Sequence, residues 1–133
     1  MNPHLFVYGS LLSTAGHANG DRLRDEARLI GPGAIAARLY RYSWYPVAIE
    51  GGDPAARIHG ELYVLADPAR SLVWLDAYEG LPAGKTVGDA YHRVERPVRL
   101  EAGSEIQAWV YLYHKDASGL QPVPDGRWRV TSR

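Results

Sequence analysis

Glu79 is the side chain of this sequence whose type and place best suit proton transfer. It closes a predicted helix in the run Leu75-Asp76-Ala77-Tyr78-Glu79-Gly80, where the unpaired main-chain carbonyl groups of a helix end disfavour negative charge. Partial burial against Tyr78 and Leu75 would raise the pKa of the carboxyl group further, which is the direction that a general base near neutral pH needs. A solvated glutamate at a helix end explains the same pattern equally well.

A second candidate is the segment Val7-Tyr8-Gly9-Ser10-Leu11, which leaves a predicted strand through a glycine. A glycine at a strand end lets the main chain approach a ligand closely. Consecutive N–H groups in such a turn can bind a carboxylate or an oxyanion. A tight turn after a core strand accounts for the same residues, and spacing alone favours that plainer interpretation.

Tyrosines form the third candidate set, because a tyrosine joins an apolar ring to a polar tip. The set comprises Tyr8, Tyr40, Tyr42, Tyr45, Tyr78, Tyr91, Tyr111 and Tyr113. Most of them are expected in the core or in half-buried strands. A few should direct their hydroxyl groups into a pocket, and we take Tyr45, Tyr111 and Tyr113 as substrate-binding candidates beside Tyr8.

Other kinds of site lack the residues that they need. The five histidines show no HExxH or similar spacing, so we expect no metal site. The chain has no cysteine, no G-x-S-x-G elbow and no P-loop, which argues against a thiol nucleophile, a hydrolase triad and a nucleotide site. We therefore expect a site that works without a cofactor.

The charge balance argues against polyanionic partners. Lys+Arg and Asp+Glu number 15 each, so no net field draws the chain to nucleic acid or to an acidic membrane. Arg127-Trp128-Arg129 is a single basic and aromatic triplet, which is a weak sign of nucleic-acid binding.

The first residues lack a signal-peptide pattern, and the apolar runs fall far short of the roughly 20 residues of a membrane span. We expect a cytoplasmic protein with a small-molecule partner.

Hydrophobic spacing and turn signals predict the elements that carry these candidates. Strands are predicted at residues 5–8, 34–42, 45–49, 57–65, 91–100 and 105–114. One short helix is predicted over residues 21–27. A clearer helix starts after Asp67 with Pro68 and stops before Gly80. Gly31-Pro32-Gly33 predicts a turn.

The strand at residues 105–114 indicates the architecture. Side chains alternate between two faces of a strand, and here one face has Ile106, Ala108, Val110 and Leu112, while the other has Trp109, Tyr111 and Tyr113. A strand with bulky residues on both faces is covered on both, as in a barrel wall beneath a helix. We predict an α+β fold with a small mixed or closed β-barrel-like sheet and about two flanking helices.

The length of 133 residues fits one domain. We expect this domain to span residues 1–133, with a core at about 4–114. Residues 115–133 contain Pro122, Pro124 and Gly126, which predicts an irregular C-terminal arm, with Trp128 as its anchor.

Taken in order, six motifs resemble the γ-glutamylcyclotransferase-like superfamily, in particular its branch of AIG2-like and γ-glutamylamine cyclotransferase proteins. The resemblance covers roughly residues 4 to 114. The motifs are Phe6-Val7-Tyr8-Gly9-Ser10-Leu11, Tyr45-Pro46, His59-Gly60-Glu61-Leu62-Tyr63, Leu75-Asp76-Ala77-Tyr78-Glu79-Gly80, Tyr91-His92-Arg93 and Ala108-Trp109-Val110-Tyr111.

The resemblance implies a barrel-like fold whose pocket holds a γ-glutamyl group. It implies that the loop of Tyr8, Gly9, Ser10 and Leu11 binds this group through its main-chain amides, and that Glu79 is the acid/base. The implied reaction converts a γ-glutamyl amide into 5-oxoproline and a free amine. Residues 13–27 and the chain after residue 114 match no part of the family pattern.

Two other functions fit the same residues. A non-catalytic module could keep the pocket to bind a small amino-acid-like ligand, since a fold does not determine a function. An amide hydrolase could use Ser10 as its nucleophile, although no histidine is placed by sequence to activate it. The leaving group of a cyclotransferase reaction, whether an amino acid or another amine, stays open at this point.

Overall fold

Eight strands and two helices follow one another in residues 1–129, the part of the chain that the computed structural model describes. The strands are β1 (His4–Val7), β2 (Ala27–Ile35), β3 (Arg38–Tyr42), β4 (Tyr45–Ile49), β5 (Ile58–Leu65), β6 (Tyr91–Leu100), β7 (Glu105–Tyr113) and β8 (Gln121–Pro122). The helices are α1 (Ala18–Glu26) and α2 (Pro68–Tyr78). Neither of these helices has the length and apolar character needed to cross a membrane.

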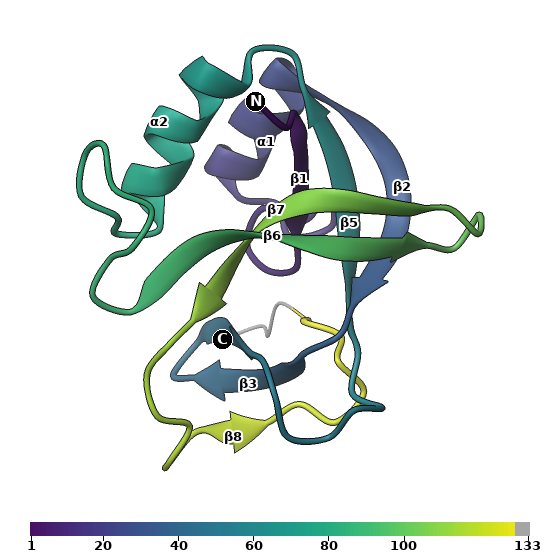
Figure 1. Ribbon diagram of the computed structural model, residues 1–133, viewed down its shortest axis with the longest axis vertical. Helices are drawn as coiled ribbons and strands as arrows, with labels where there is room; N and C mark the ends of the chain where they lie inside the picture. Colours follow the sequence, from purple (N-terminus) through teal and green to yellow (C-terminus); the bar gives the residue numbers. More distant parts are fainter. Residues whose placement is uncertain (130–133) are drawn as a thin grey trace.

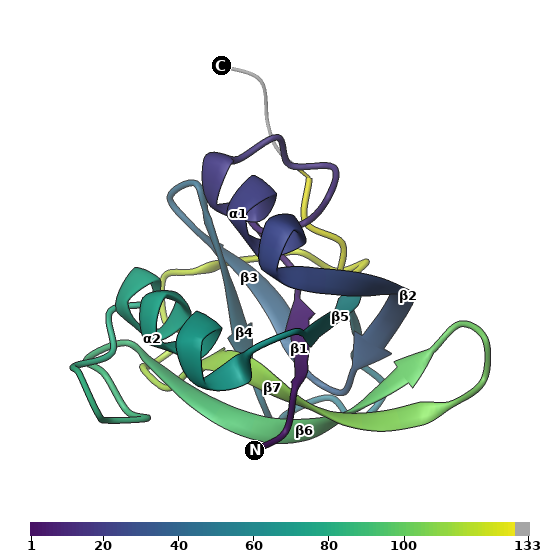
Figure 2. The same cartoon turned by 90° about the horizontal axis from the view of Figure 1, so that it is seen from above.

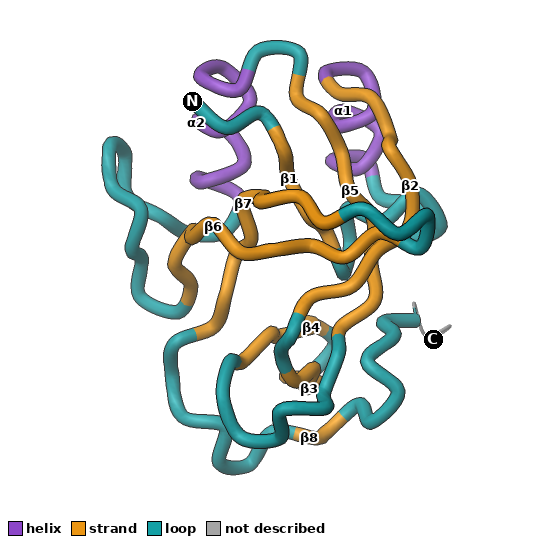
Figure 3. Tube along the Cα trace, turned by 45° about the vertical axis from the view of Figure 1, so that its right-hand side comes forward, coloured by secondary structure: helices purple, strands orange, loops and turns teal. Residues whose placement is uncertain are grey.

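Five strands close into a barrel in the order β1-β5-β2-β6-β7. The sheet is mixed, because β1 runs antiparallel to β5 and parallel to β7, where Leu5 lies opposite Trp109. Both helices lie at the same end of the molecule as β1, and β3 and β8 lie at the other end (Figures 1 and 3). Together with β4 they form a separate three-stranded sheet. The predicted barrel-like sheet with two flanking helices is confirmed.

Alternating side chains of the barrel wall enter two different parts of the core. Along β7, Ala108 and Val110 pack in one buried cluster, whereas Trp109 and Tyr111 pack in the other, which includes Leu72 of α2. Seen from above, α1 lies beside β2, and α2 lies beside the pair β6 and β7 (Figure 2). The prediction that the last long strand is covered on both faces is confirmed.

Helix α2 begins and ends at the predicted signals. The Asp67 side chain accepts a hydrogen bond from the Arg70 N–H at 3.3 Å, which caps the amino end. Pro68 occupies the first turn, where a missing N–H costs nothing. Gly80 has a φ of 79°, the left-handed conformation that ends many helices. These signals place Glu79 at the carboxyl end of α2.

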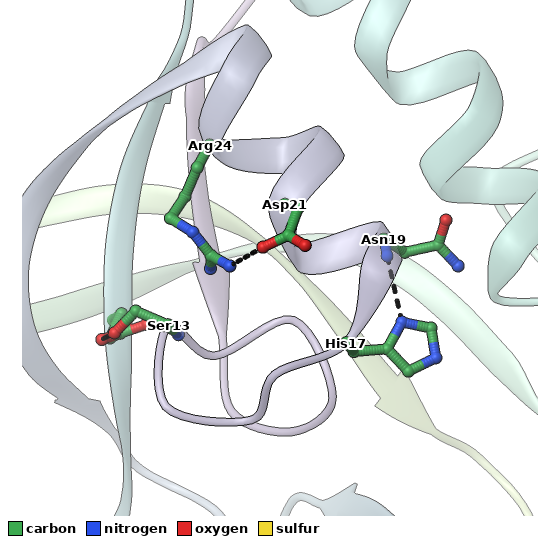
Figure 4. Close-up of polar contacts among 6 residues, drawn as sticks. Ser13, His17, Asn19, Asp21 and Arg24 are labelled. Atoms are coloured by element: carbon green, nitrogen blue, oxygen red, sulfur yellow. Dashed lines mark hydrogen bonds and ion pairs between the residues drawn. The ribbon is translucent and has the colours of Figure 1, made fainter.

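Helix α1 starts three residues before the predicted position. The ring Nδ1 of His17 accepts a hydrogen bond from the Asn19 N–H at 3.1 Å, and Arg24 forms an ion pair with Asp21 at 2.6 Å within the helix (Figure 4). Histidine is a rare residue at a helix start, so the sequence pattern missed this cap. The helix ends at Glu26 because Ala27 already has the extended conformation of β2.

The prediction of a turn at Gly31-Pro32-Gly33 is wrong, because these residues lie within β2. The register of β2 against β5 shifts between Leu29 and Gly31, so a bulge absorbs the irregularity that the glycines suggested. Gly33 faces β6 so closely that a Cβ atom there would lie 2.9 Å from Val98. Glycine serves a close strand approach here.

The C-terminal arm is not irregular throughout. Gln121 and Pro122 form β8 and pair with β3, and the Val123 N–H donates to the Leu39 carbonyl at 2.9 Å. The predicted anchor is confirmed, because Trp128 packs against the core and lies 4.4 Å beneath the guanidinium of Arg41. The last four residues of the predicted arm, 130–133, lie outside the described residues.

The closure of the barrel depends on Gly60, where a Cβ atom would lie 2.1 Å from the Val7 carbonyl oxygen. We expect Gly60→Ala to lower the free energy of unfolding by about 2 kcal/mol or more, because β1 and β5 would have to separate. Gly20→Ala is the matched control, since its new methyl group meets only ordinary contacts of 3.4 Å, with Arg24 of α1 and with the Leu11 carbonyl oxygen, and alanine favours the helix. Urea unfolding of both variants checks this, and equal stabilities would contradict it.

Candidate functional site

A cavity of about 440 Å³ opens where β1 ends, between the carboxyl end of α2 and the β3–β4 hairpin. This volume lies in the range of small-molecule pockets. The cavity is lined by all eight residues that the sequence predicts for the site: Tyr8, Gly9, Ser10, Leu11, Tyr45, Glu79, Tyr111 and Tyr113. The fold therefore brings these candidates together, while their individual roles stay predictions.

Glu79 presents a carboxyl group to this cavity without a protein partner. Within residues 1–129 it has neither an ion pair nor a side-chain hydrogen bond, and the helix end adds unpaired carbonyl dipoles nearby. Burial raises the pKa of Glu79 from its ordinary value to about 7. A carboxyl group with this pKa can both accept and release a proton at neutral pH.

Three tyrosines surround this carboxyl group. Burial is the main cause that raises the pKa values of Tyr8, Tyr91 and Tyr111, and the charge of Glu79 raises all three further. Their hydroxyl groups therefore stay protonated. Tyr8 donates to the Tyr111 carbonyl at 2.6 Å, and Tyr91 donates to the Pro46 carbonyl at 3.2 Å. These bonds hold the rings as fixed walls of the cavity.

The loop after β1 turns tightly at the cavity wall. The Leu12 N–H donates to the Gly9 carbonyl at 3.0 Å. Within the described residues, the N–H groups of Gly9, Ser10 and Leu11 have no hydrogen-bond acceptor, so they are available to an anionic group. A Cβ atom at position 9 would lie 2.5 Å from the Pro46 ring. Glycine is required here because the β3–β4 hairpin packs directly on the loop.

Ser10 is not arranged as an activated nucleophile. Its hydroxyl oxygen lies 2.5 Å from the hydroxyl oxygen of Tyr78, and no histidine is among the described residues that line the cavity. His17 packs edge-on against the Tyr78 ring instead. Across residues 1–129, no group of three or more His, Asp or Glu side chains is placed to hold a metal ion.

A buried ion pair fixes α2 against the barrel next to the site. The Arg93 guanidinium binds the Asp76 carboxylate through two nitrogens. Nε lies 2.7 Å from Oδ1, and Nη2 lies 3.1 Å from Oδ2. The Tyr111 hydroxyl donates to the same Asp76 at 2.6 Å, and Arg93 stacks on the Trp109 ring at 4.4 Å. Asp76 lies one turn before Glu79, so this cluster positions the candidate acid.

Sequence reasoning missed part of this site. It recorded Asp76 and Arg93 only as members of separate motifs, because no local spacing shows that residues 17 positions apart form a pair. Tyr42, Tyr78 and Tyr91 belonged to the tyrosine set without an assigned place. The remaining unassigned lining residues are Phe6, Val7, Pro46, Asp89, Ala90 and Lys115.

Residues 5–130 match the protein family described as "Gamma-glutamyl cyclotransferase, AIG2-like". The chain is 31% identical to the gamma-glutamylcyclotransferase family protein YtfP of Escherichia coli over 125 residues, which cover 93% of this chain and 94% of YtfP. It superimposes on the crystal structure of an AIG2-like protein of Mus musculus with a TM-score of 0.64, at 24% identity, covering 98% of this chain and 96% of the mouse chain. It also superimposes on YkqA of Bacillus subtilis with a TM-score of 0.69 at 21% identity, covering 96% of this chain but 40% of YkqA.

Removing the ion pair between Asp76 and Arg93 should strongly destabilise the folded protein. The two side chains are 16% and 8% exposed, so Asp76→Ala leaves a buried guanidinium and the Tyr111 hydroxyl without their acceptor. We expect a loss of about 3–5 kcal/mol in the free energy of unfolding. Asp21→Ala, which breaks the exposed pair with Arg24, is the control and should cost less than about 1 kcal/mol. Urea unfolding distinguishes the two, and similar losses would contradict the anchoring role.

The raised pKa of Glu79 predicts a pH dependence of stability. Because its pKa in the folded protein, about 7, lies above the ordinary 4.5, the folded state binds this proton more tightly than the unfolded chain. The free energy of unfolding should therefore fall as the pH rises from 4.5 to 7, by up to about 3 kcal/mol from this group. The Glu79→Gln variant lacks this titrating group, so its free energy of unfolding should rise relative to that of the wild type between pH 4.5 and pH 7.

Urea unfolding of both proteins between pH 4 and pH 8 measures the effect. Glu105→Gln, which changes an exposed glutamate at the start of β7, is the control and should follow the wild-type curve. A constant difference between wild type and Glu79→Gln at every pH would show that the carboxyl group titrates normally.

Proposed function

This chain belongs to the γ-glutamyl cyclotransferase, AIG2-like family, and we propose that it converts a γ-glutamyl amide into 5-oxoproline and a free amine. The observation that carries the proposal is Glu79: a carboxyl group without a partner among residues 1–129, with a pKa raised to about 7 by burial, at the wall of a ligand-sized cavity. The family supplies the class of reaction, and this group supplies a means of moving the proton that the reaction requires.

The reaction is intramolecular. The α-amine nitrogen of the γ-glutamyl group attacks its own γ-carbonyl carbon, one new C–N bond closes a five-membered ring, and the C–N bond to the leaving amine breaks. One proton moves from the attacking nitrogen to the departing nitrogen, so no water or other reactant is consumed. Because both reacting groups belong to one molecule, holding the folded conformer is a large part of catalysis, with effective molarities on the order of 10⁵ M or more.

Glu79 carries that proton in the proposed mechanism. A free α-amine has a pKa of about 8, so at neutral pH its ammonium form first loses one proton to solvent. When the neutral amine attacks, the carboxylate of Glu79, with its pKa of about 7, accepts the second proton that this nitrogen gives up and then delivers it to the leaving nitrogen. No other described side chain binds this carboxyl group, so both of its oxygens are available to the substrate.

The loop after β1 is suited to bind an anionic group of the substrate. The N–H groups of Gly9, Ser10 and Leu11 bind the α-carboxylate of the substrate or the oxyanion that forms at the γ-carbonyl. The rings of Tyr8, Tyr111 and Tyr113 enclose the glutamyl chain, since all three are at most 8% exposed. Enclosure keeps the substrate folded and strengthens each of these polar contacts.

Glu79→Gln should abolish 5-oxoproline formation while the fold is retained, with a fall in kcat of about 10²- to 10⁴-fold. In the wild type, kcat/KM should rise with pH through about 7, because the carboxylate form is the active one. Chromatographic detection of 5-oxoproline from a panel of γ-glutamyl amides checks both statements, with Glu105→Gln as the control. Unchanged turnover in Glu79→Gln contradicts the role of this residue, and ligand binding without product by the wild type favours the non-catalytic module.

A further inference from the structure

The lining of the cavity contains few charged side chains. Only three of its described lining residues carry a formal charge at neutral pH: Glu79, Asp89 and Lys115. Glu79 is committed to the reacting amine in the proposed mechanism. Asp89 and Lys115 form an ion pair at 2.8 Å that the chemistry does not use. This pair can therefore act on a part of the substrate beyond the γ-glutamyl group.

The pair belongs to the exposed part of the cavity wall, whereas the carboxyl group of Glu79 is buried. The charge of Glu79 acts on Tyr8, Tyr91 and Tyr111. Lys115 interacts instead with Asp89, Tyr113 and Tyr42. The Lys115 and Asp89 side chains are 47% and 90% exposed, so they stand at the mouth. A glutamyl group held between Glu79 and the loop after β1 would direct its leaving group toward this mouth.

We infer that Lys115 is a specificity-determining residue that selects γ-glutamyl amides whose leaving group carries a carboxylate, as an α-amino acid does. This inference rests on the proposed function. A lysine ammonium is a compact cation that pairs well with a carboxylate, and it is the only cation among the described lining residues. An uncharged leaving amine would leave this contact unused.

Substrate binding need not first break a strong interaction. Exposed ion pairs such as that of Lys115 with Asp89 contribute little to stability, so Lys115 can exchange the Asp89 carboxylate for that of the substrate. Asp89 then acts against binding, because its charge competes for Lys115 and repels the incoming carboxylate. The exposed rings of Tyr42 and Tyr45 line the same mouth and provide an apolar surface for the side chain of a leaving amino acid.

The test compares two substrates that differ by one carboxylate, γ-glutamyl-phenylalanine and γ-glutamyl-phenethylamide. We expect the wild type to favour the first by about fivefold or more in kcat/KM. Lys115→Met should remove this preference by raising KM for γ-glutamyl-phenylalanine alone, and Asp89→Asn should increase the preference. Lys85→Met, which changes the only other lysine in a loop outside the cavity lining, should behave as the wild type.

Binding is measured by calorimetry on the inactive Glu79→Gln protein and on the double variant that also carries Lys115→Met. The double variant should bind γ-glutamyl-phenylalanine more weakly than Glu79→Gln, whereas the two proteins should bind γ-glutamyl-phenethylamide equally. Equal turnover of both substrates by the wild type, or a preference that survives Lys115→Met, overturns the inference and leaves the proposed function standing. Failure to form 5-oxoproline from either substrate overturns both.

Discussion

The bidentate ion pair between Asp76 and Arg93 holds the site together, because it joins α2 to the barrel wall immediately beside Glu79. Asp76 also accepts the Tyr111 hydroxyl of β7, and Tyr111 in turn accepts, through its carbonyl, the hydroxyl of Tyr8. One carboxylate thus links the helix, two neighbouring strands and the start of the loop after β1. Together with the contact between the Ser10 and Tyr78 hydroxyl groups, this link sets the distance between the helix end and that loop.

Glu79 differs from Asp76, because it has no such partner in the part of the chain that the structure describes. Asp76 is satisfied by a guanidinium and a phenol, so it acts as a structural anion. Burial without a partner brings the pKa of Glu79 to about 7, and this destabilises the folded protein at neutral pH. A carboxyl group kept at such a cost is the kind of feature that functional sites retain.

Local patterns were reliable wherever local forces decide the structure. Helix α2 could be predicted from Asp67, Pro68 and Gly80, because capping and proline geometry act within one turn. The alternation along β7 revealed a strand covered on both faces, because side chains of a strand alternate whatever lies above them. The turn predicted at Gly31-Pro32-Gly33 failed because those glycines serve a bulge and the close approach of β6, which are long-range features.

By itself, the sequence singled out Glu79 and the loop of Gly9, Ser10 and Leu11 as candidates, and it predicted the α+β barrel, because each of these has a local pattern and the ordered motifs resemble one family. The tertiary structure alone decided that Asp76 pairs with Arg93 and that Lys115 stands at the cavity mouth with Asp89. The packing of α2 on β6 brings the first pair together, and the antiparallel pairing of β6 with β7, which sets Tyr91 opposite Tyr113, brings the second pair together. It likewise decided the pKa of Glu79, since desolvation depends on every segment that surrounds the carboxyl group.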